Sequence, residues 1–259
     1  MEVPPVKDNP PAARDVALDV SHVAAGYPGV RVLEDVSFSV RRGEIFALLG
    51  GSGCGKSTLL KHLIGLSPAR AGRIAVEGLE LTPATRGRIF RRVGVMYQSG
   101  ALFGSMSVLE NVMLPLEEFT RLPAEARRTL ALMQLELVGL ADAADKMPAD
   151  LSGGMKKRAA IARAMALEPA ILFLDEPSAG LDPVTSNALD ELILRLRATR
   201  GMTFVIVTHE LASVFKIVDR CAMFDRARRA MVALGRPAEL RDASGDPFVR
   251  AFFNRGDPP

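Results

Sequence analysis

The sequence has little of what marks a secreted or a membrane-spanning protein. Its 259 residues include only two cysteines, Cys54 and Cys221, and these do not form a CxxC pair. Two such cysteines build no disulfide framework, which fits a protein of the reducing cytosol. No stretch reaches the roughly 18 consecutive apolar residues that a transmembrane helix needs. We therefore expect any work at a membrane to be done through partner proteins.

A strong charge of one sign is also missing. The net charge of +3 is small for 259 residues, and it argues weakly against nucleic acid as the main partner, which usually requires a concentrated basic face. Residues 1–14 are rich in proline and carry charges, and they lack the apolar segment of a secretory signal. We expect a disordered N-terminal tail over 1–14, one folded domain over 15–245 and a C-terminal tail over 246–259.

Two kinds of apolar pattern predict a mixed α/β fold. Val36, Phe38 and Val40 alternate with serines, which is typical of an antiparallel strand with one wet face, and such strands are expected over 17–40. Strands buried on both faces of a parallel sheet are instead apolar throughout, and ligands bind beyond their carboxyl ends. Three runs have this second pattern, each followed by a polar or glycine-rich turn: Ile45–Leu49, Ile171–Leu174 and Phe204–Val207.

A helical subdomain is predicted between parts of the sheet, over about 99–158. Apolar residues recur at three-to-four spacing in Val108–Met113 and in Ala124–Leu137, as on one face of a helix. Prolines usually lie near helix ends, and three of them are interpreted as punctuation here: Pro115, Pro123 and Pro148.

A glycine-rich loop between the first buried strand and a predicted helix over Thr58–Leu66 carries the clearest chemistry. It matches the pattern GxxxxGK[ST], in which backbone N–H groups and a helix N-terminus converge on phosphate oxygens. We expect Lys56 to reach the β- and γ-phosphates and the Ser57 hydroxyl to bind Mg²⁺. The alternative is a glycine-rich turn without a ligand, and the flanking strand and helix argue against it. The expected nucleotide-binding residues of this loop are Gly50, Gly51, Ser52, Gly53, Cys54, Gly55, Lys56, Ser57 and Thr58.

Polar residues also end the other two buried strands. Asp175 and Glu176 follow the second strand, and because neighbouring strand residues point to opposite faces, we expect different roles for them. Asp175 is placed to hold Mg²⁺ through a water, and Glu176 to face the γ-phosphate and polarise the attacking water. His209, after the third strand, is a candidate to contact the same phosphate and water. The alternatives are solvated acids and a histidine that only fills a strand end.

A second anion site is predicted at Leu151–Gly154, before an alanine-rich helix over Met155–Leu167. Ser152, Gly153 and Gly154 would present backbone N–H groups at the start of that helix. The alternative is that Ser152 is only a helix cap. The simplest use of two phosphate sites in one chain is a head-to-tail dimer, in which each ATP lies between the glycine-rich loop of one copy and Ser152 of the other.

These motifs, in this order, resemble the ATPases of ABC transporters from about Val16 to Leu240. The resemblance implies a P-loop NTPase fold with a RecA-like mixed sheet core, an antiparallel β subdomain and an inserted helical subdomain. It implies ATP hydrolysis with Mg²⁺ that powers a membrane permease. It also implies that Gln98 is catalytic and a Mg²⁺ ligand, that Asp182 contacts the nucleotide, and that Tyr27 stacks on adenine. The alternative for Tyr27 is an ordinary packed tyrosine.

One residue departs from the family pattern and narrows the resemblance. Met155 stands where the family usually has glutamine, which puts the side-chain contacts of that glutamine in doubt but not the phosphate contacts. Together with Lys156–Arg158, Tyr97–Phe103 and Asp246–Phe253, it resembles the ATPases of lipid-asymmetry (Mla) and mammalian-cell-entry systems. That implies transport of phospholipid or another hydrophobic lipid between bacterial membranes, from the cytoplasmic face of the inner membrane. An ABC ATPase for another solute is the alternative, because catalytic residues do not encode the cargo.

The same resemblance implies three partners: the permease, a lipid-binding subunit of the mammalian-cell-entry type and a small regulatory subunit. Apolar residues in a loop-like segment are candidates for a groove that accepts a permease helix, with burial in the helical subdomain as the alternative: Leu102, Phe103 and Met106. Phenylalanines near the C-terminus suggest docking on the chain itself or on its dimer mate: Phe248, Phe252 and Phe253.

Overall fold

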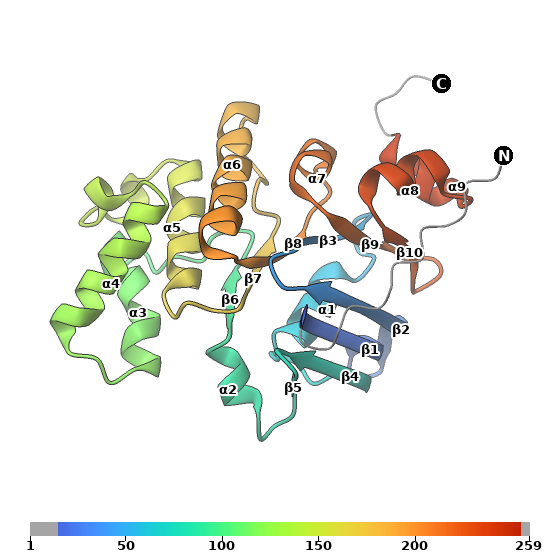
Figure 1. The fold of residues 1–259 in the computed structure, drawn as a ribbon, viewed down its shortest axis with the longest axis horizontal. Coiled ribbons are helices and arrows are strands. Elements are labelled where there is room, and N and C mark those ends of the chain that lie inside the picture. Colours follow the sequence, from blue (N-terminus) through green and yellow to red (C-terminus); the bar gives the residue numbers. More distant parts are fainter. Residues whose placement is uncertain (1–14, 255–259) are drawn as a thin grey trace.

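The computed structural model describes residues 15–254, so the tail predicted over 1–14 lies outside the described residues. Figure 1 shows a mixed sheet in the middle of the molecule and a group of helices at one end. An antiparallel sheet lies below the mixed sheet, on the side away from these helices. Within the described part of the chain, no helix combines the length and hydropathy of a membrane span.

The central sheet has six strands in the order β10-β9-β3-β8-β7-β6. The three continuous apolar runs of the sequence form its parallel centre, as predicted: β3 (Ile45–Gly50), β7 (Ile171–Asp175) and β8 (Thr203–Val207). Every residue of β3 and β8 is buried, because other elements cover both faces of the sheet. The outer strands are parallel β6 (Val93–Met96), parallel β9 (Arg220–Asp225) and antiparallel β10 (Ala230–Gly235).

The antiparallel sheet has the order β2-β1-β4-β5. Its strands are β1 (Val16–Tyr27), β2 (Val30–Arg41), β4 (Ala71–Val76) and β5 (Leu79–Glu80). Val36, Phe38 and Val40 of β2 are buried and the serines between them are partly exposed, which confirms the predicted alternation. The ring of Phe38 stacks on that of Phe46 in β3, with centroids 5.1 Å apart, and so joins the two sheets.

Helix α1 (Lys56–Leu63) lies between the two sheets (Figure 1). It starts directly after the glycine-rich loop, earlier than the predicted Thr58, and it ends before the predicted Leu66. The early end has a local cause, because Gly65 takes a left-handed φ of 77° that terminates the helix. Leu59 and Leu60 on its buried side join the core of the antiparallel sheet.

The helical end of the molecule contains α3 (Val108–Phe119), α4 (Ala124–Leu137) and α5 (Gly153–Met165). Pro123 precedes α4 and Pro148 begins a short 3₁₀ helix, but Pro115 lies inside α3, so its interpretation as punctuation is wrong. A proline inside a helix removes one hydrogen bond. The buried face of α3, which includes Val112 and Leu116, supplies packing that outweighs this loss.

The remaining helices are α2 (Arg86–Phe90), α6 (Pro183–Arg200), α7 (Leu211–Ile217), α8 (Pro237–Ala243) and α9 (Pro247–Phe253), and a further short 3₁₀ helix spans Ala141–Ala143. The phenylalanines near the C-terminus belong to α9. Phe252 and Phe253 are buried beside Val214 and Met223, and Phe248 packs against the same cluster. Of the two docking alternatives, the structure shows docking on the chain itself.

Candidate functional site

The glycine-rich loop, residues 50–57, follows β3 and requires glycine at specific points. Gly50, Gly53 and Gly55 have positive φ angles of 145°, 72° and 105°. A Cβ on Gly50 would also lie 2.5 Å from the backbone oxygen of Phe224. A residue with a Cβ would be strained in these conformations. The glycines therefore allow a tight loop whose backbone is not covered by side chains.

Lys56 is the first residue of α1 and is buried, with its ammonium folded over the loop. Its Nζ donates hydrogen bonds to the carbonyl oxygens of Gly50, at 2.8 Å, and Gly51, at 3.1 Å. Ser57 is exposed in the first turn of the same helix, and Thr58 is buried beside it. The predicted positive group and the predicted hydroxyl ligand therefore lie together at the start of α1.

Asp175 ends β7 and has a buried carboxylate oxygen without a partner. No hydrogen bond reaches its Oδ1 from the described residues. Burial is the main cause that raises the pKa of Asp175, and the neighbouring charge of Glu176 adds to it, while Lys56 and Lys157 act in the opposite direction. An unpaired carboxylate oxygen in a polar cleft fits a cation or an ordered water as its partner.

Glu176 has a different backbone conformation from the one we expected. β7 ends at Asp175, and Glu176 takes a left-handed φ of 47°, so strand alternation does not decide where its side chain points. Its Oε1 lies 2.9 Å from Nδ1 of His209, at the carboxyl end of the adjacent strand β8. The two residues predicted to act on the attacking water are thus in direct contact.

A cleft of about 580 Å³ joins Gln98 to Asp175. It is also lined by Tyr97, Ser99 and Gly180. The segment that carries Gln98 and the strand that carries Asp175 come from distant parts of the sequence, and the parallel pairing of β6 with β7 brings them together. Two of the three predicted metal ligands, Gln98 and Asp175, thus lie on one cleft, and the third, Ser57, does not line it.

Tyr27 is placed beside the phosphate-binding end of α1. Its hydroxyl oxygen lies 3.1 Å from the hydroxyl of Thr58, and its side chain stays accessible. The preceding residue, Gly26, donates its N–H to Nε2 of His62, which is buried in α1. A packed tyrosine would be covered, so the accessible ring argues against that alternative.

Ser152 caps α5, and its hydroxyl accepts a hydrogen bond from the N–H of Met155 at 3.3 Å. The helix begins at Gly153, before the predicted Met155. Within residues 15–254 no hydrogen bond connects Ser152 to the glycine-rich loop. Met155 is partly buried against the helical core, where an apolar side chain suits the site better than glutamine would.

The neighbouring start of α6 contains Asp182. Its carboxylate accepts hydrogen bonds from the N–H groups of Val184 and Thr185 and from the Thr185 hydroxyl. These bonds, those of Thr185 above all, lower the pKa of Asp182. The side chain is a helix cap here, and its predicted contact with a nucleotide rests on the family resemblance.

Three polar residues that we did not predict hold the surrounding segments: Asn111 and Lys157, which are buried, and Arg163, which is partly buried. Asn111 bonds to the backbone of Phe103 in both directions. Arg163 donates to the carbonyl oxygen of Gly100, and Lys157 donates to those of Gln98 and Glu176. The carbonyl partners of Arg163 and Lys157 lie far away in sequence, and no motif signals such contacts.

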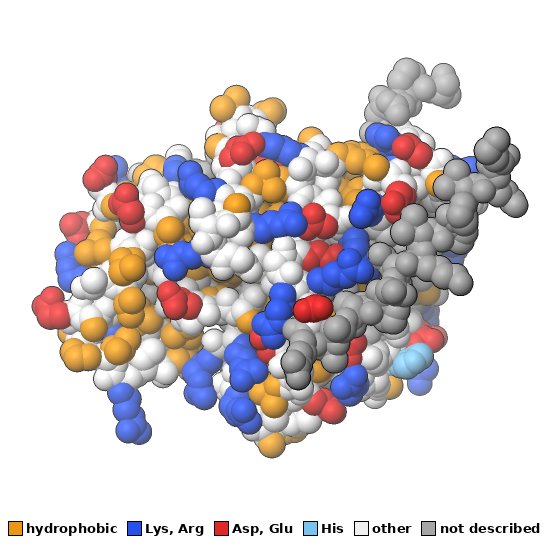
Figure 2. Space-filling model, in the orientation of Figure 1, with side chains coloured by type: hydrophobic (Ala, Val, Ile, Leu, Met, Phe, Trp, Pro, Cys, Tyr) orange, Lys and Arg blue, Asp and Glu red, His pale blue; other side chains and the backbone are white. Residues whose placement is uncertain are grey.

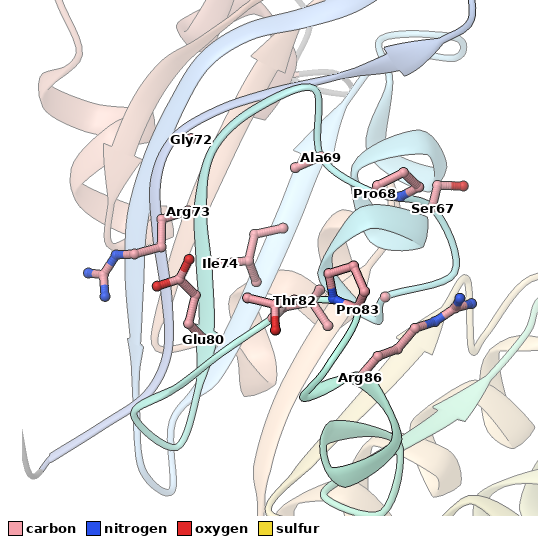
Figure 3. Close-up of a pocket in the computed structure, with 12 residues that line it drawn as sticks. Ser67, Pro68, Ala69, Gly72, Arg73, Ile74, Glu80, Thr82, Pro83 and Arg86 are labelled. Carbon is pink, nitrogen blue, oxygen red and sulfur yellow. The ribbon is translucent and has the colours of Figure 1, made fainter.

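A separate cavity of about 370 Å³ lies between the end of α1, β4 and α2. Figure 3 shows Ile74, Thr82 and Pro83 around its middle, with the guanidinium groups of Arg73 and Arg86 directed away on opposite sides. None of the predicted site residues lines it. It therefore adds nothing to the nucleotide site.

Comparisons with known proteins agree with this arrangement. The ABC transporter family matches residues 33–179. The chain is 41% identical over 226 residues to the intermembrane phospholipid transport system ATP-binding protein MlaF of Escherichia coli (strain K12), covering 86% of this chain and 83% of that protein. It is 38% identical over 242 residues to the probable ribonucleotide transport ATP-binding protein mkl of Mycobacterium leprae, covering 92% and 69%.

Two solved structures share the fold. CbiO1 from Clostridium perfringens, part of the ABC transporter complex CbiONQ, gives a TM-score of 0.81 at 29% identity and covers 88% of this chain and 92% of its own. The MJ0796 cassette, a dimer bound to ADP and Pi, gives 0.76 at 28% identity and covers 85% and 98%. The fold is thus that of an ABC cassette. The chain belongs to the ABC transporter family and is the ATPase subunit of an ABC transporter.

Proposed function

We propose that this ATPase uses Mg²⁺ and ATP to move phospholipid, or another hydrophobic lipid, between bacterial membranes. The contact between Glu176 and His209 beside the glycine-rich loop is the observation that carries the hydrolytic part. Similarity to MlaF supports the lipid part, and Met155, directly after the predicted anion site at Leu151–Gly154, agrees with it.

The glycine-rich loop binds the triphosphate of the substrate in this proposal. Its positive-φ glycines leave backbone N–H groups uncovered, and α1 adds the positive end of its dipole. Lys56 exchanges its carbonyl partners, Gly50 and Gly51, for the β- and γ-phosphate oxygens. Tyr27 stacks on the adenine, close to Thr58.

The residues around Asp175 fit a magnesium ion. The unpartnered Oδ1 of Asp175 supplies an oxygen acceptor, used through a water, and Gln98 lines the same cleft. The exposed hydroxyl of Ser57 supplies another oxygen at the start of α1. When bound, the ion neutralises charge that develops on the phosphate oxygens.

Glu176 acts as the general base towards the attacking water. Its carboxylate accepts the proton, and the bond to His209 fixes the orientation of the carboxylate. Gln98, exposed on the neighbouring segment, helps to place the water. Phosphoryl transfer needs positioning and charge stabilisation more than covalent chemistry, and these groups supply both.

The active form is a head-to-tail dimer in this proposal. Ser152 and Gly153 are exposed and do not bond to the glycine-rich loop of their own chain. The related MJ0796 cassette, which is a dimer with ADP and Pi, supports pairing of two copies. Ser152, Gly153 and Gly154 would then bind the ATP that the partner copy holds.

A groove of about 420 Å³ next to Gln98 is the proposed site for the permease. Phe90, Phe103 and Phe119 line it, and Phe103 is 51% exposed. Of the other two predicted groove residues, Leu102 packs against the helical core, and neither it nor Met106 lines the groove. Figure 2 shows apolar side chains gathered on the same helical end of the molecule, over α3 and α4. An exposed apolar groove of this kind suits an amphipathic partner helix.

This docking would hold the chain peripherally at the cytoplasmic face of the bacterial inner membrane. The other proposed partners are a lipid-binding subunit of the mammalian-cell-entry type and a small regulatory subunit, both supported by the similarity to MlaF. A second candidate cargo is a ribonucleotide, because the similar protein mkl is described as a probable ribonucleotide transport protein.

Substitution of Glu176 tests the hydrolytic part. We expect Glu176→Gln to bind ATP with near-normal affinity, to accumulate as a dimer and to lose turnover by about 10²-fold or more, because the general base is gone. Glu136→Gln on the exposed side of α4 is the matched control and should hydrolyse normally. Normal turnover in Glu176→Gln would overturn the assignment of the base.

Two measurements on the complex purified with its permease test the cargo. Mass spectrometry of the bound small molecules should find phospholipid, and ATP should drive transfer of labelled phospholipid between vesicles. Bound nucleotides and no lipid transfer would favour the second candidate.

A further inference from the structure

A buried lysine connects the two segments that carry the proposed chemistry. Lys157 lies on α5 and is 7% exposed. Its ammonium donates to the carbonyl oxygen of Gln98 and, at 3.2 Å, to that of Glu176. Gln98 follows β6 and Glu176 follows β7, so one cation bridges the ends of two neighbouring strands.

We infer that Lys157 is a positioning residue for ATP hydrolysis, because its ammonium fixes the backbone of Glu176 relative to Gln98 and ties both to α5, the helix that Ser152 caps. This inference rests on the proposed function and deepens it. Lys157 touches neither substrate nor metal in this scheme, and it acts through Glu176.

The backbone of Glu176 needs such support. Its φ of 47° lies in the left-handed region, which a non-glycine residue occupies at a cost and keeps only when its surroundings hold it there. The N–H of Glu176 donates to the carbonyl oxygen of Val207 at 2.8 Å. Lys157 binds the carbonyl oxygen of the same residue. Both backbone polar groups are thus fixed, and the carboxylate stays directed at His209.

The charge of Lys157 also suits its position. Burial lowers the pKa of Lys157, while the carboxylates of Asp175 and Glu176 raise it. Lys157 in turn acts to lower the pKa of Asp175, whose main perturbation is burial. A neutral side chain here would leave two adjacent carboxylates with less positive charge nearby.

Helix α5 extends this link in both directions. Its N-cap is Ser152, the proposed contact with the ATP of the partner copy. Beyond Lys157, Arg163 donates to the carbonyl oxygens of Gly100, at 2.8 Å, and Ala101, at 2.7 Å. One helix therefore holds the segment after Gln98 at two points and the catalytic glutamate at one. ATP bound at Ser152 would act on the other nucleotide site through this single rigid element.

The test compares three variants of the full-length chain. Lys157→Met removes the charge and the donors, Lys157→Arg keeps a buried cation, and Lys156→Met makes the first change one position earlier on the same helix. We expect Lys157→Met to lower kcat about tenfold or more with little change in the Kd for a fluorescent ATP analogue. Lys157→Arg should recover much of the lost turnover, and Lys156→Met should hydrolyse normally.

A purely structural role would give a different result. It would lower kcat only in proportion to the folded fraction, which thermal unfolding measures in the same samples. If Lys157→Met does not fold, Lys157→Gln, which keeps N–H donors without the charge, replaces it with the same expected loss of kcat. Turnover within about twofold of the parent in a folded Lys157 variant lacking the charge would overturn the inference.

A double-mutant cycle shows whether Lys157 acts through Glu176. In the Glu176→Gln background, Lys157→Met should change the residual single-turnover rate by less than about twofold, because the group it positions is already lost. A full additional tenfold loss would mean that Lys157 acts elsewhere. The cycle also separates the two proposals, since normal turnover of Glu176→Gln alone contradicts the proposed function, whereas additivity contradicts only this inference.

Discussion

The imidazole of His209 and the carboxylate of Glu176 form a hydrogen bond, with Nδ1 2.9 Å from Oε1. The side chain of Glu176 is 14% exposed and that of His209 is 65% exposed, so the pair is buried on the carboxylate side and open on the imidazole side. Among the described residues, Nε2 of His209 has no hydrogen-bond partner. The pair thus combines a carboxylate of fixed orientation with a second ring nitrogen that is available to a ligand.

Substitution of His209 tests this arrangement. We expect His209→Ala to lower kcat by about 10²-fold, because the glutamate loses its orienting partner and the transition state loses a contact. ATP affinity should change little, since the residues proposed to bind ATP are those of the glycine-rich loop and Tyr27. His22→Ala is the control, because His22 is an exposed histidine that also bonds to a carboxylate, that of Asp35. Equal effects of the two substitutions, measured by phosphate release, would argue against a specific role for His209.

His62 provides a second prediction, on nucleotide affinity. Its Nε2 accepts the N–H of Gly26 and its Nδ1 binds the carbonyl oxygen of Ser67, both at 3.1 Å, which requires the neutral ring with the proton on Nδ1. His62→Leu would leave the buried N–H of Gly26 unpaired, at a cost of about 1–3 kcal/mol in the free energy of unfolding. Because Tyr27 follows Gly26, we also expect weaker ATP binding.

Denaturant unfolding and equilibrium binding measure the two effects separately. Tyr27→Ala is the informative comparison, since it should weaken ATP binding without the loss of stability. A His62→Leu chain that unfolds at the same denaturant concentration as the parent would refute the hydrogen-bond argument.

The glycine-rich loop and the three buried strands were predictable because their signals are local. The pattern GxxxxGK[ST] predicts the loop from residues that are adjacent in sequence. The continuous apolar run Ile171–Leu174 likewise predicts a strand that is buried on both faces of a sheet, as the structure shows. The left-handed backbone of Glu176 was not predictable, because its bonds to Lys157 and Val207 come from two separate elements. Pro115 was misjudged for the same reason, since packing of α3 against other helices decides its place.

Met155 is a residue whose environment the sequence motif did not predict. The sequence shows that it departs from the family pattern, but only the structure shows that it packs against the helical core. Neither the sequence nor the structure of one chain shows a dimer, because Ser152 forms a hydrogen bond only within its own helix start.

The thiol of Cys221 gives a third prediction, on reactivity. Burial raises the pKa of Cys221 to about 12. Since the thiolate is the reactive form and a raised pKa keeps the thiol protonated, the native chain at pH 8 should leave Cys221 unmodified by iodoacetamide. Unfolding in guanidinium chloride should expose it to rapid modification. Peptide mass spectrometry distinguishes it from Cys54, and equal rates in native and unfolded chains would contradict its burial.

The permease groove gives the last prediction. Phe103 is 51% exposed, with the guanidinium of Arg163 5.9 Å from its ring centroid, so a charge at this position should cost the isolated chain little stability. We expect Phe103→Asp to hydrolyse ATP as an isolated chain, to fail to purify with the permease, and to stop lipid transfer. A buried charge cannot be desolvated cheaply at an apolar interface, which is the cause of the expected loss.

Met133→Asp is the matched control for this substitution. Met133 is 49% exposed on α4 of the same helical region, and it does not line the groove. The same change there should leave assembly and transfer intact. If Phe103→Asp assembles and transports as Met133→Asp does, the permease does not dock in this groove. If both variants fail, the whole exposed helical end takes part in docking.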